Sequence, residues 1–299
     1  MKPLAKQIST FIFLVFLFSS LPYFLMIHSH HIGAGSGLVV RLVMWCPAAA
    51  AFATCALFRI ETRTLGWSWR PLRYEVLGYS VPLLYAIPVY LAVWILVRGS
   101  FALAAFEKEA ADSLGLSSSP HVAAFGLMIP ILATLGVIGS LANALGEEIG
   151  WRGFLLPRLA GQFGFTFGCI VSGAIWAAWH YPGLLWADYN AGTNPRYALT
   201  CFTLMVIADA FILGWVRLKS GSLWPCAMLH ASHNLFIQAI LDRMTAPAGR
   251  ALYFTTEFGC GLVLTVGATA VYFWTRRGEL SSATGDTVAR PIAAISTSM

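Results

Sequence analysis

Long apolar runs, each bounded by a short polar segment, recur along this 299-residue chain. A helix that crosses a bilayer needs about 20 consecutive apolar residues, and eight stretches of about that length are present. They predict membrane-spanning helices at 8–27, 37–58, 76–97, 122–145, 164–186, 198–216, 220–241 and 253–274. The pattern therefore predicts an all-α fold, a polytopic transmembrane helical bundle of about eight spans.

The composition agrees with this fold and excludes an ordinary soluble domain. Charged residues make up 11% of the chain, whereas a soluble domain carries about 25%. With the N-terminus inside, 13 Lys and Arg residues fall in inner segments, five fall in outer segments and Arg41 lies within a span. This distribution follows the positive-inside rule and predicts that both termini face the cytoplasm. Topology thus explains the net charge of +6, so we expect a surrounding lipid bilayer and no nucleic-acid partner.

The two ends of the chain carry different signals. Lys2 and Lys6 precede the first apolar run as they would in a signal peptide, but the run is longer than a signal core and no small-residue cleavage motif follows. We therefore expect an uncleaved first span in a transmembrane bundle of residues 1–277. Residues 278–299 are rich in Ser, Thr and Ala, which predicts a disordered cytoplasmic tail.

Two adjacent glutamates, Glu147 and Glu148, stand at the end of the fourth apolar run. An ionisable residue at membrane depth is costly and by default indicates function. Glu148 and Arg152 are four residues apart, so on a helix they share a face and can pair, while Glu147 points elsewhere. Gly150 would allow a neighbouring backbone to come close. The plainer alternative is a cytoplasmic loop with one surface ion pair.

Histidines mark two further apolar runs. His180 follows Trp176 by one helical turn, so the indole can pack against the imidazole, and Tyr181-Pro182-Gly183 predicts the end of that helix. His230 and Asn234 are spaced to project from one helix face in the seventh run, with His233 beside them. The alternatives are an interfacial histidine at 180, and an interhelical hydrogen bond at 230–234 that contributes about 0.6 kcal/mol.

Taken together, these side chains provide the groups that peptide hydrolysis requires. A carboxylate can activate water, a histidine can help to hold that water, and a His/Asn pair can donate hydrogen bonds to an oxyanion. A cavity that excludes bulk water would strengthen each of these electrostatic interactions.

The three motifs in this order resemble the CPBP family of intramembrane proteases. They are Glu147-Glu148-x-x-x-Arg152, an aromatic-x-x-x-His motif that ends at His180, and His230-x-x-x-Asn234. The family includes type II CAAX prenyl endopeptidases and bacteriocin-processing or Abi-type relatives, and its core corresponds to residues 120–245. Phenylalanine usually begins the second motif, where this chain has Trp176, and His233 has no clear counterpart. The resemblance implies a multi-pass hydrolase of a bacterial plasma membrane.

The resemblance also implies a role for each motif residue. Glu147 would be the general base that activates water, and His180 would help to hold that water. Glu148 and Arg152 would pair to orient the first motif. The side chains that stabilise the tetrahedral intermediate would be His230 and Asn234. The substrate would be a peptide or protein at the membrane: a prenylated C-terminus, a leader peptide or a membrane-anchored segment.

The resemblance leaves the metal question open. We expect no cofactor, because the sequence lacks the His-Glu-x-x-His motif of helical zinc proteases. The alternative is a zinc site made by Glu147, His180 and His230 with one position open for water.

Two other functions are compatible with the residues alone. One is a non-enzymatic membrane scaffold or a bacteriocin-immunity-type protein on the same fold. The other is a transporter with Asp209, Glu257 and the histidines as a proton relay, which the lack of an inverted repeat disfavours.

The expected spans raise a problem of depth. They put Glu147 at the inner end of span four and His180 about 24 Å into span five, given a rise of about 1.5 Å per residue. A shared site therefore requires helix four to continue to about Pro157, which would bury the acidic pair in the bundle. Because the expected spans place Glu147 at the inner end of span four, we expect the cavity to open towards the cytoplasm.

Overall fold

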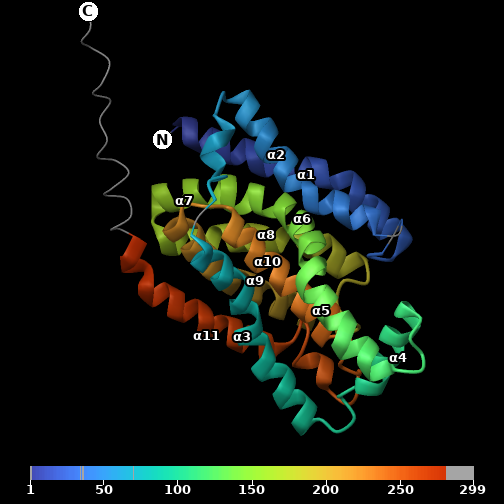
Figure 1. The fold of residues 1–299 in the computed structure, drawn as a ribbon. Helices are drawn as coiled ribbons and strands as arrows, with labels where there is room; N and C mark the ends of the chain where they lie inside the picture. The colour runs from blue at the N-terminus through green and yellow to red at the C-terminus, as the bar shows by residue number, and fades with distance from the viewer. Residues whose placement is uncertain (1, 34, 36, 70, 281–299) are drawn as a thin grey trace, which may run out of the picture.

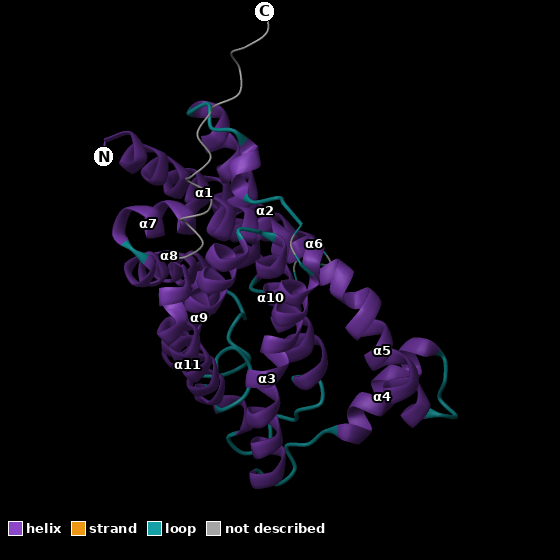
Figure 2. Ribbon diagram, turned by 60° about the vertical axis from the view of Figure 1, so that its left-hand side comes forward, coloured by secondary structure: helices purple, strands orange, loops and turns teal. Residues whose placement is uncertain are grey.

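The computed structural model describes residues 2–33, 35, 37–69 and 71–280, and the described chain is an all-α helical protein (Figure 1; Figure 2). Most of the expected tail, residues 281–299, lies outside the described residues. The separate helices are α1 (Lys2–Ser29), α2 (Leu38–Leu57), α3 (Leu72–Leu96), α4 (Leu103–Leu114), α8 (Phe165–Trp186), α9 (Pro195–Ser220) and α11 (Cys260–Thr275). Short 3₁₀ turns are η1 (Thr62–Leu65), η6 (Ala251–Tyr253) and η7 (Arg276–Leu280).

Two further helices are composite, because α-helical and π-helical segments follow one another without a break. The first consists of η2 (Val122–Met128), α5 (Ile129–Ile131), η3 (Leu132–Gly136), α6 (Val137–Glu148), η4 (Ile149–Leu155) and α7 (Leu156–Phe163). The second consists of α10 (Trp224–His233) and η5 (Asn234–Leu241).

Five helices are long and apolar enough to cross a membrane, namely those at Pro3–Ser29, Leu38–Leu57, Leu72–Leu96, Val122–Phe163 and Pro195–Ser220. Large apolar side chains on them face outward, among them Leu21, Leu84 and Leu135, each at least 65% exposed. Lipid would cover such side chains in a membrane. The chain is therefore a multi-pass membrane protein. The other expected spans correspond to α8, to α10 with η5, and to α11.

The expected end of span four at residue 145 is wrong, because the helix continues through the glutamate motif to Phe163. Phe154, Leu155 and Leu156 are fully buried and extend its apolar face beyond the polar motif. Glu147 precedes Phe163 by 16 residues and His180 follows Phe165 by 15 residues. At about 1.5 Å per residue, both lie about 22–24 Å from the turn that joins the two helices. The depth problem is thereby removed.

The glutamate motif is held against α1 and α2. A Cβ atom at Gly150 would lie 2.5 Å from Cβ of Pro47, so only glycine allows α2 to pack this closely. Phe11 of α1 stacks on Phe154, with 4.8 Å between ring centroids. Helix α8 continues past Pro182 to Trp186, so the expected end at 181–183 is also wrong.

The loops gather at two ends of the bundle. At one end, His31 of the α1–α2 loop lies 2.6 Å from Asp188 of the α8–α9 loop, and Tyr189 donates to Glu257, which precedes α11. At the other end, Trp224 of α10 donates to the carbonyl of Trp67 in the α2–α3 loop. The N-terminus of α1 and the end of α11 lie on the left in Figure 1, whereas the α1–α2 loop and α4 lie on the right.

Candidate active site

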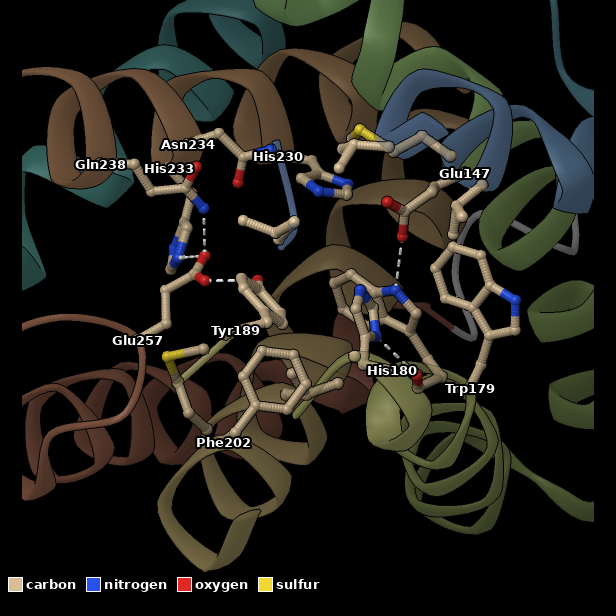
Figure 3. Close-up of a pocket in the computed structure, with 18 of the residues that line it drawn as sticks. Glu147, Trp179, His180, Tyr189, Phe202, His230, His233, Asn234, Gln238 and Glu257 are labelled. Carbon is tan, nitrogen blue, oxygen red and sulfur yellow. Dashed lines mark hydrogen bonds and ion pairs between the residues drawn. The ribbon is translucent and has the colours of Figure 1, made fainter. Parts of the chain in front are cut away.

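A cavity of about 140 Å³ lies inside the bundle, between α1, α2, α6, α8, α9 and the composite helix of α10 and η5. Its walls include one or two side chains from each of the three motifs: Glu147, His180, His230 and Asn234. Figure 3 shows Glu147 and His180 on one side of the cavity, Glu257 and His233 on the opposite side, and His230 and Asn234 along one helix between them. Motif residues up to 87 positions apart in sequence thus line one cavity.

Glu147 lies in the wall of the cavity and is only 2% exposed. Its Oε2 atom accepts a hydrogen bond of 2.7 Å from the indole Nε1–H of Trp176. The loop alternative for the glutamate pair is therefore wrong: both carboxyl groups are buried, as a shared site requires.

Glu148 connects the first motif to the third. Its Oε1 atom accepts from Nη1 of Arg152 at 2.8 Å, the ion pair that the spacing predicts. The same oxygen lies 2.9 Å from Nδ1 of His230, a contact that the sequence did not indicate. Because a carboxylate only accepts, His230 carries a proton on Nδ1 and turns Nε2 away from Glu148.

Trp176 contacts a residue of every motif. Besides its bond to Glu147, its ring lies 3.9 Å from the guanidinium carbon of Arg152, a cation–π contact. Its ring centroid is 5.5 Å from that of His230 and 6.1 Å from that of His180. The sequence predicted only the packing against His180. The tryptophan at this position therefore does more than supply an aromatic neighbour.

His180 is fixed by its own helix. Its Nδ1 atom lies 2.9 Å from the carbonyl oxygen of Trp176, one turn earlier. Since a carbonyl only accepts, Nδ1 carries the proton and Nε2 of the neutral ring is an acceptor. The rings of Trp179 and Phe202 lie 4.7 and 5.0 Å from the imidazole centroid and restrict its rotation.

A second polar group, which we call the Glu257 cluster, forms the opposite wall. Glu257 accepts from Tyr189 at 2.6 Å and from Gln238 at 2.7 Å, and it lies 3.2 Å from Nε2 of His233. Nδ1 of His233 is 2.6 Å from the hydroxyl of Tyr85. Tyr189 and Gln238 had no signal in the sequence, because a single polar residue near a span end is common.

Asp209 of α9 also lines the cavity and is only 5% exposed. Its Oδ1 atom has no hydrogen-bond partner in the described part of the chain. The sequence singled out Asp209 and Glu257 for a proton relay, and both carboxyl groups lie in the same cavity as the three motifs.

Both of the motifs on composite helices adjoin π-helical turns. The segment η4 begins directly after Glu148, and η5 begins at Asn234. Such turns are frequent at functional sites because they change the direction of side chains along a helix.

The residues proposed for zinc do not form a metal site in this geometry. Within the described residues, no three His, Cys, Asp or Glu side chains are grouped closely enough to hold a metal ion. One polar atom of each candidate has a protein partner: Oε2 of Glu147 accepts from Trp176, Nδ1 of His180 faces a backbone carbonyl, and Nδ1 of His230 faces Glu148. Because these side chains are not grouped as metal ligands, we derive no step through a metal.

Residues 129–236 match the family described as type II CAAX prenyl endopeptidase Rce1-like, which is a family of proteases. The match contains all of the motif residues and ends before Glu257. No curated protein matches the chain.

Proposed function

Because residues 129–236 form an Rce1-like type II CAAX prenyl endopeptidase domain, we propose that this protein is an intramembrane endopeptidase in which Glu147 activates water. The observation that carries the proposal is the convergence of Glu147, His180, His230 and Asn234 on one cavity inside the helical bundle. The donors and acceptors around that cavity suggest a role for each residue and the kind of bond that is cut.

The acceptor atoms around the cavity suit a water molecule between Glu147 and His180. The Glu147 carboxylate accepts hydrogen bonds, and so does Nε2 of His180, because its Nδ1 already carries the proton. A water that donates one hydrogen to each of them keeps its lone pairs directed at a substrate carbonyl. The hydrogen bond from Trp176 holds the Glu147 carboxylate in this orientation.

The donors for the oxyanion would come from the third motif. Asn234 can donate through its side-chain amide, and His230 can donate through Nε2 when both ring nitrogens are protonated. The Glu148 carboxylate, 2.9 Å from Nδ1, offsets the positive charge of that form. One such donor typically contributes about 10²–10³-fold in rate.

The chemical step balances with these groups alone. The water oxygen bonds to the carbonyl carbon while one water proton passes to Glu147, which gives a tetrahedral intermediate whose oxyanion faces His230 and Asn234. The C–N bond then breaks, and the leaving nitrogen takes the proton from Glu147. The carboxylic acid formed at the carbonyl carbon gives its remaining proton to the amine, so the products are a carboxylate and an ammonium group, and Glu147 is again ionised.

The walls of the cavity indicate the kind of substrate. Methionine, valine and isoleucine side chains and aromatic rings form its apolar part. Its titratable groups include carboxyl groups and histidines, with no Lys or Arg among the described lining residues. A free C-terminal carboxylate would meet no permanent cation there. We therefore favour an internal peptide bond in an apolar segment of a membrane-associated or lipidated peptide or protein.

We further propose that the chain crosses a bacterial plasma membrane eight times with both termini inside. The alternation of loops between the two ends of the bundle supports this topology. Helix α11 spans 16 residues. At about 1.5 Å per residue, it is about 24 Å long, so it would cross a hydrocarbon core of about 30 Å only with help from its flanking residues or local thinning of the bilayer.

The test is peptide cleavage by the purified protein in proteoliposomes, with a library of apolar peptides. Glu147→Gln keeps the size of the side chain but cannot act as a base, so the rate should fall by about 10²–10⁴-fold. The matched control is Glu75→Gln, since Glu75 is a buried glutamate of α3 that is not among the cavity-lining residues.

Two outcomes would contradict the proposal. Cleavage that survives Glu147→Gln excludes this residue as the base. A wild-type protein that binds peptides but never cleaves them would support the non-enzymatic scaffold instead.

A further inference from the structure

We infer that the cavity opens on the extracytoplasmic side of the membrane and receives a polypeptide segment exposed at the outer leaflet. The inference rests on the proposed function, because it specifies the substrate of that same site. It reverses the direction of opening that the expected span ends implied.

The lining residues show at which end the cavity opens. Met26 lies three residues before the end of α1, Val40 two residues after the start of α2, and Gly183 three residues before the end of α8. Tyr189 and Glu257 belong to the loops at the same end. The loops of the opposite end, at 58–69 and 221–223, contribute no described lining residue. The entrance to the cavity therefore lies where the α1–α2, α8–α9 and η5–α11 loops meet.

Solvent exposure agrees with this direction. Gln238, at the outer part of the Glu257 cluster, is exposed, and Ile32 and Tyr189 are half-buried. Glu147 and His230 lie deeper and are 2% and 6% exposed. The polar wall thus leads from the loop end to the catalytic carboxylate.

The end opposite the cavity carries the basic residues of the inner segments. Arg152 and Arg217 are buried within the bundle, so the positive-inside rule concerns the others. Among the described residues these are Lys6, Arg59, Arg63, Arg73, Arg158, Lys219, Arg276 and Arg277. Because Lys and Arg concentrate on the cytoplasmic side, this end faces the cytoplasm.

The cavity end has a different charge pattern. Its acidic residues include Glu107, Glu109, Asp112 and Asp188. Two of its basic residues are engaged by these acids: Lys108 pairs with Asp112, and Arg243 pairs with Glu109. With Arg98, Arg196, Arg250 and Arg41 near the start of α2, this end has six described Lys and Arg residues against the eight named at the opposite end, so it faces away from the cytoplasm.

The substrate class follows from the direction of opening. A lipidated C-terminus on a cytoplasmic protein would be presented at the wrong end of the bundle. An exported or membrane-anchored polypeptide, with an apolar stretch next to the outer leaflet, reaches the loops that surround the cavity. The occupant is thus an internal segment of such a polypeptide.

Cysteine labelling tests the orientation without any need for cleavage. The native cysteines are buried or half-buried, so the unsubstituted protein gives the background. Ser118→Cys and Asn190→Cys place thiols at the cavity end, and Thr62→Cys places one at the opposite end. In intact bacterial cells, a membrane-impermeant maleimide should label the first two variants, and Thr62→Cys should react only after permeabilisation. Labelling of Thr62→Cys in intact cells, alone or together with the other two, would overturn the inference.

A pair of reporters then tests the substrate. The same apolar target segment is anchored in the membrane and exposed either outside or inside, in cells with wild-type protein or with Glu147→Gln. Cleavage of the outer reporter only, and only by the wild type, is the expected result. Cleavage of the inner reporter would overturn the inference. If neither reporter is cleaved but the cysteines of the cavity end are labelled in intact cells, the proposed function is contradicted and the measured orientation still holds.

Discussion

Nδ1 of His230 lies 2.9 Å from Oε1 of Glu148, so the second glutamate of the first motif directly fixes the imidazole of the third motif. Arg152 donates to the same oxygen, and all three side chains are at least 92% buried. A single buried carboxylate thus positions two cationic or polar groups that come from different helices.

This shared carboxylate predicts the effect of Glu148→Gln. The amide has the same size but no charge, so a buried Arg152 loses its counter-ion and His230 loses its strongest acceptor. Hydrogen bonds to charged groups contribute about 1.5–3 kcal/mol each, and the unfolding free energy should fall by at least that amount. Thermal unfolding in detergent and peptide cleavage should both be impaired. A variant with full stability and full activity would show that the carboxylate is dispensable.

Trp176 offers a second test, because its ring and its N–H group have separable functions. Trp176→Phe keeps a ring beside Arg152 and His230 but removes the donor to Glu147. Trp176→Ala removes both and leaves a space in the core, which typically costs about 3–5 kcal/mol. We expect the alanine variant to unfold at a clearly lower temperature than the phenylalanine variant. Equal unfolding temperatures would exclude the packing role of the ring.

Much of this arrangement could be anticipated from the sequence. The parts that could not be anticipated were missed for physical reasons. Apolar run lengths indicate helices because lipid requires continuous apolar surface, and they located every helix that carries a motif. They misplaced the end of the fourth span because Glu147, Glu148 and Arg152 look like a polar loop until their partners are known. Besides Arg152, Glu148 contacts His230, which is 82 residues away, and no local pattern encodes such a contact.

The Glu257 cluster is a second set of contacts that the sequence could not predict. The sequence grouped Glu257 and the histidines only as members of a possible proton relay, and it predicted no contact between Glu257 and His233. Their contact depends on the packing of the composite α10–η5 helix against the loop before α11, together with Tyr189 from a third segment. A pattern within one segment does not encode a contact among three.

The close packing of α2 on the glutamate motif predicts a stability difference between two glycines. A methyl group at Gly150 would lie 2.5 Å from Cβ of Pro47 and 2.8 Å from its carbonyl oxygen. Gly150→Ala should therefore destabilise the protein by about 1–3 kcal/mol through overpacking. A methyl group at Gly161 of α7 would meet no neighbouring atom within 4 Å, so Gly161→Ala should be neutral or stabilising by about 0.5–1 kcal/mol. Thermal unfolding of the two variants checks the order, and an equal effect would contradict it.

Glu257, which lies in the loop before α11, predicts an acid-sensitive contribution to stability. Burial alone would raise the pKa of this carboxyl group, but hydrogen bonds and charge from His233, with further bonds from Tyr189 and Gln238, lower the pKa from 4.5 to about 2. A carboxyl group with a lowered pKa in the folded state stabilises the protein above the unfolded pKa. That contribution, on the order of 3 kcal/mol, is lost as the pH falls from about 4.5 towards 2.

The measurement is the unfolding temperature of wild type and Glu257→Gln between pH 7 and pH 3. The wild type should lose stability below about pH 4.5, and the variant should be less stable at pH 7 but show a flatter profile. Parallel profiles would show that Glu257 does not titrate as inferred.

The placement of the three candidate ligands predicts that activity does not depend on zinc. Glu147, His180 and His230 each direct a polar atom to a protein partner, and within the described chain they do not form a metal-binding group. Metal analysis of the purified protein should find far less than one zinc ion per chain, and 1,10-phenanthroline should leave the cleavage rate unchanged. One bound zinc per chain that is lost in His180→Ala, with activity restored by added zinc in the wild type, would contradict this prediction. Oε1 of Glu147 and Nε2 of His180 and His230 would then have to lie closer together than in this structure, and metal coordination would replace the proposed water-activating role of Glu147.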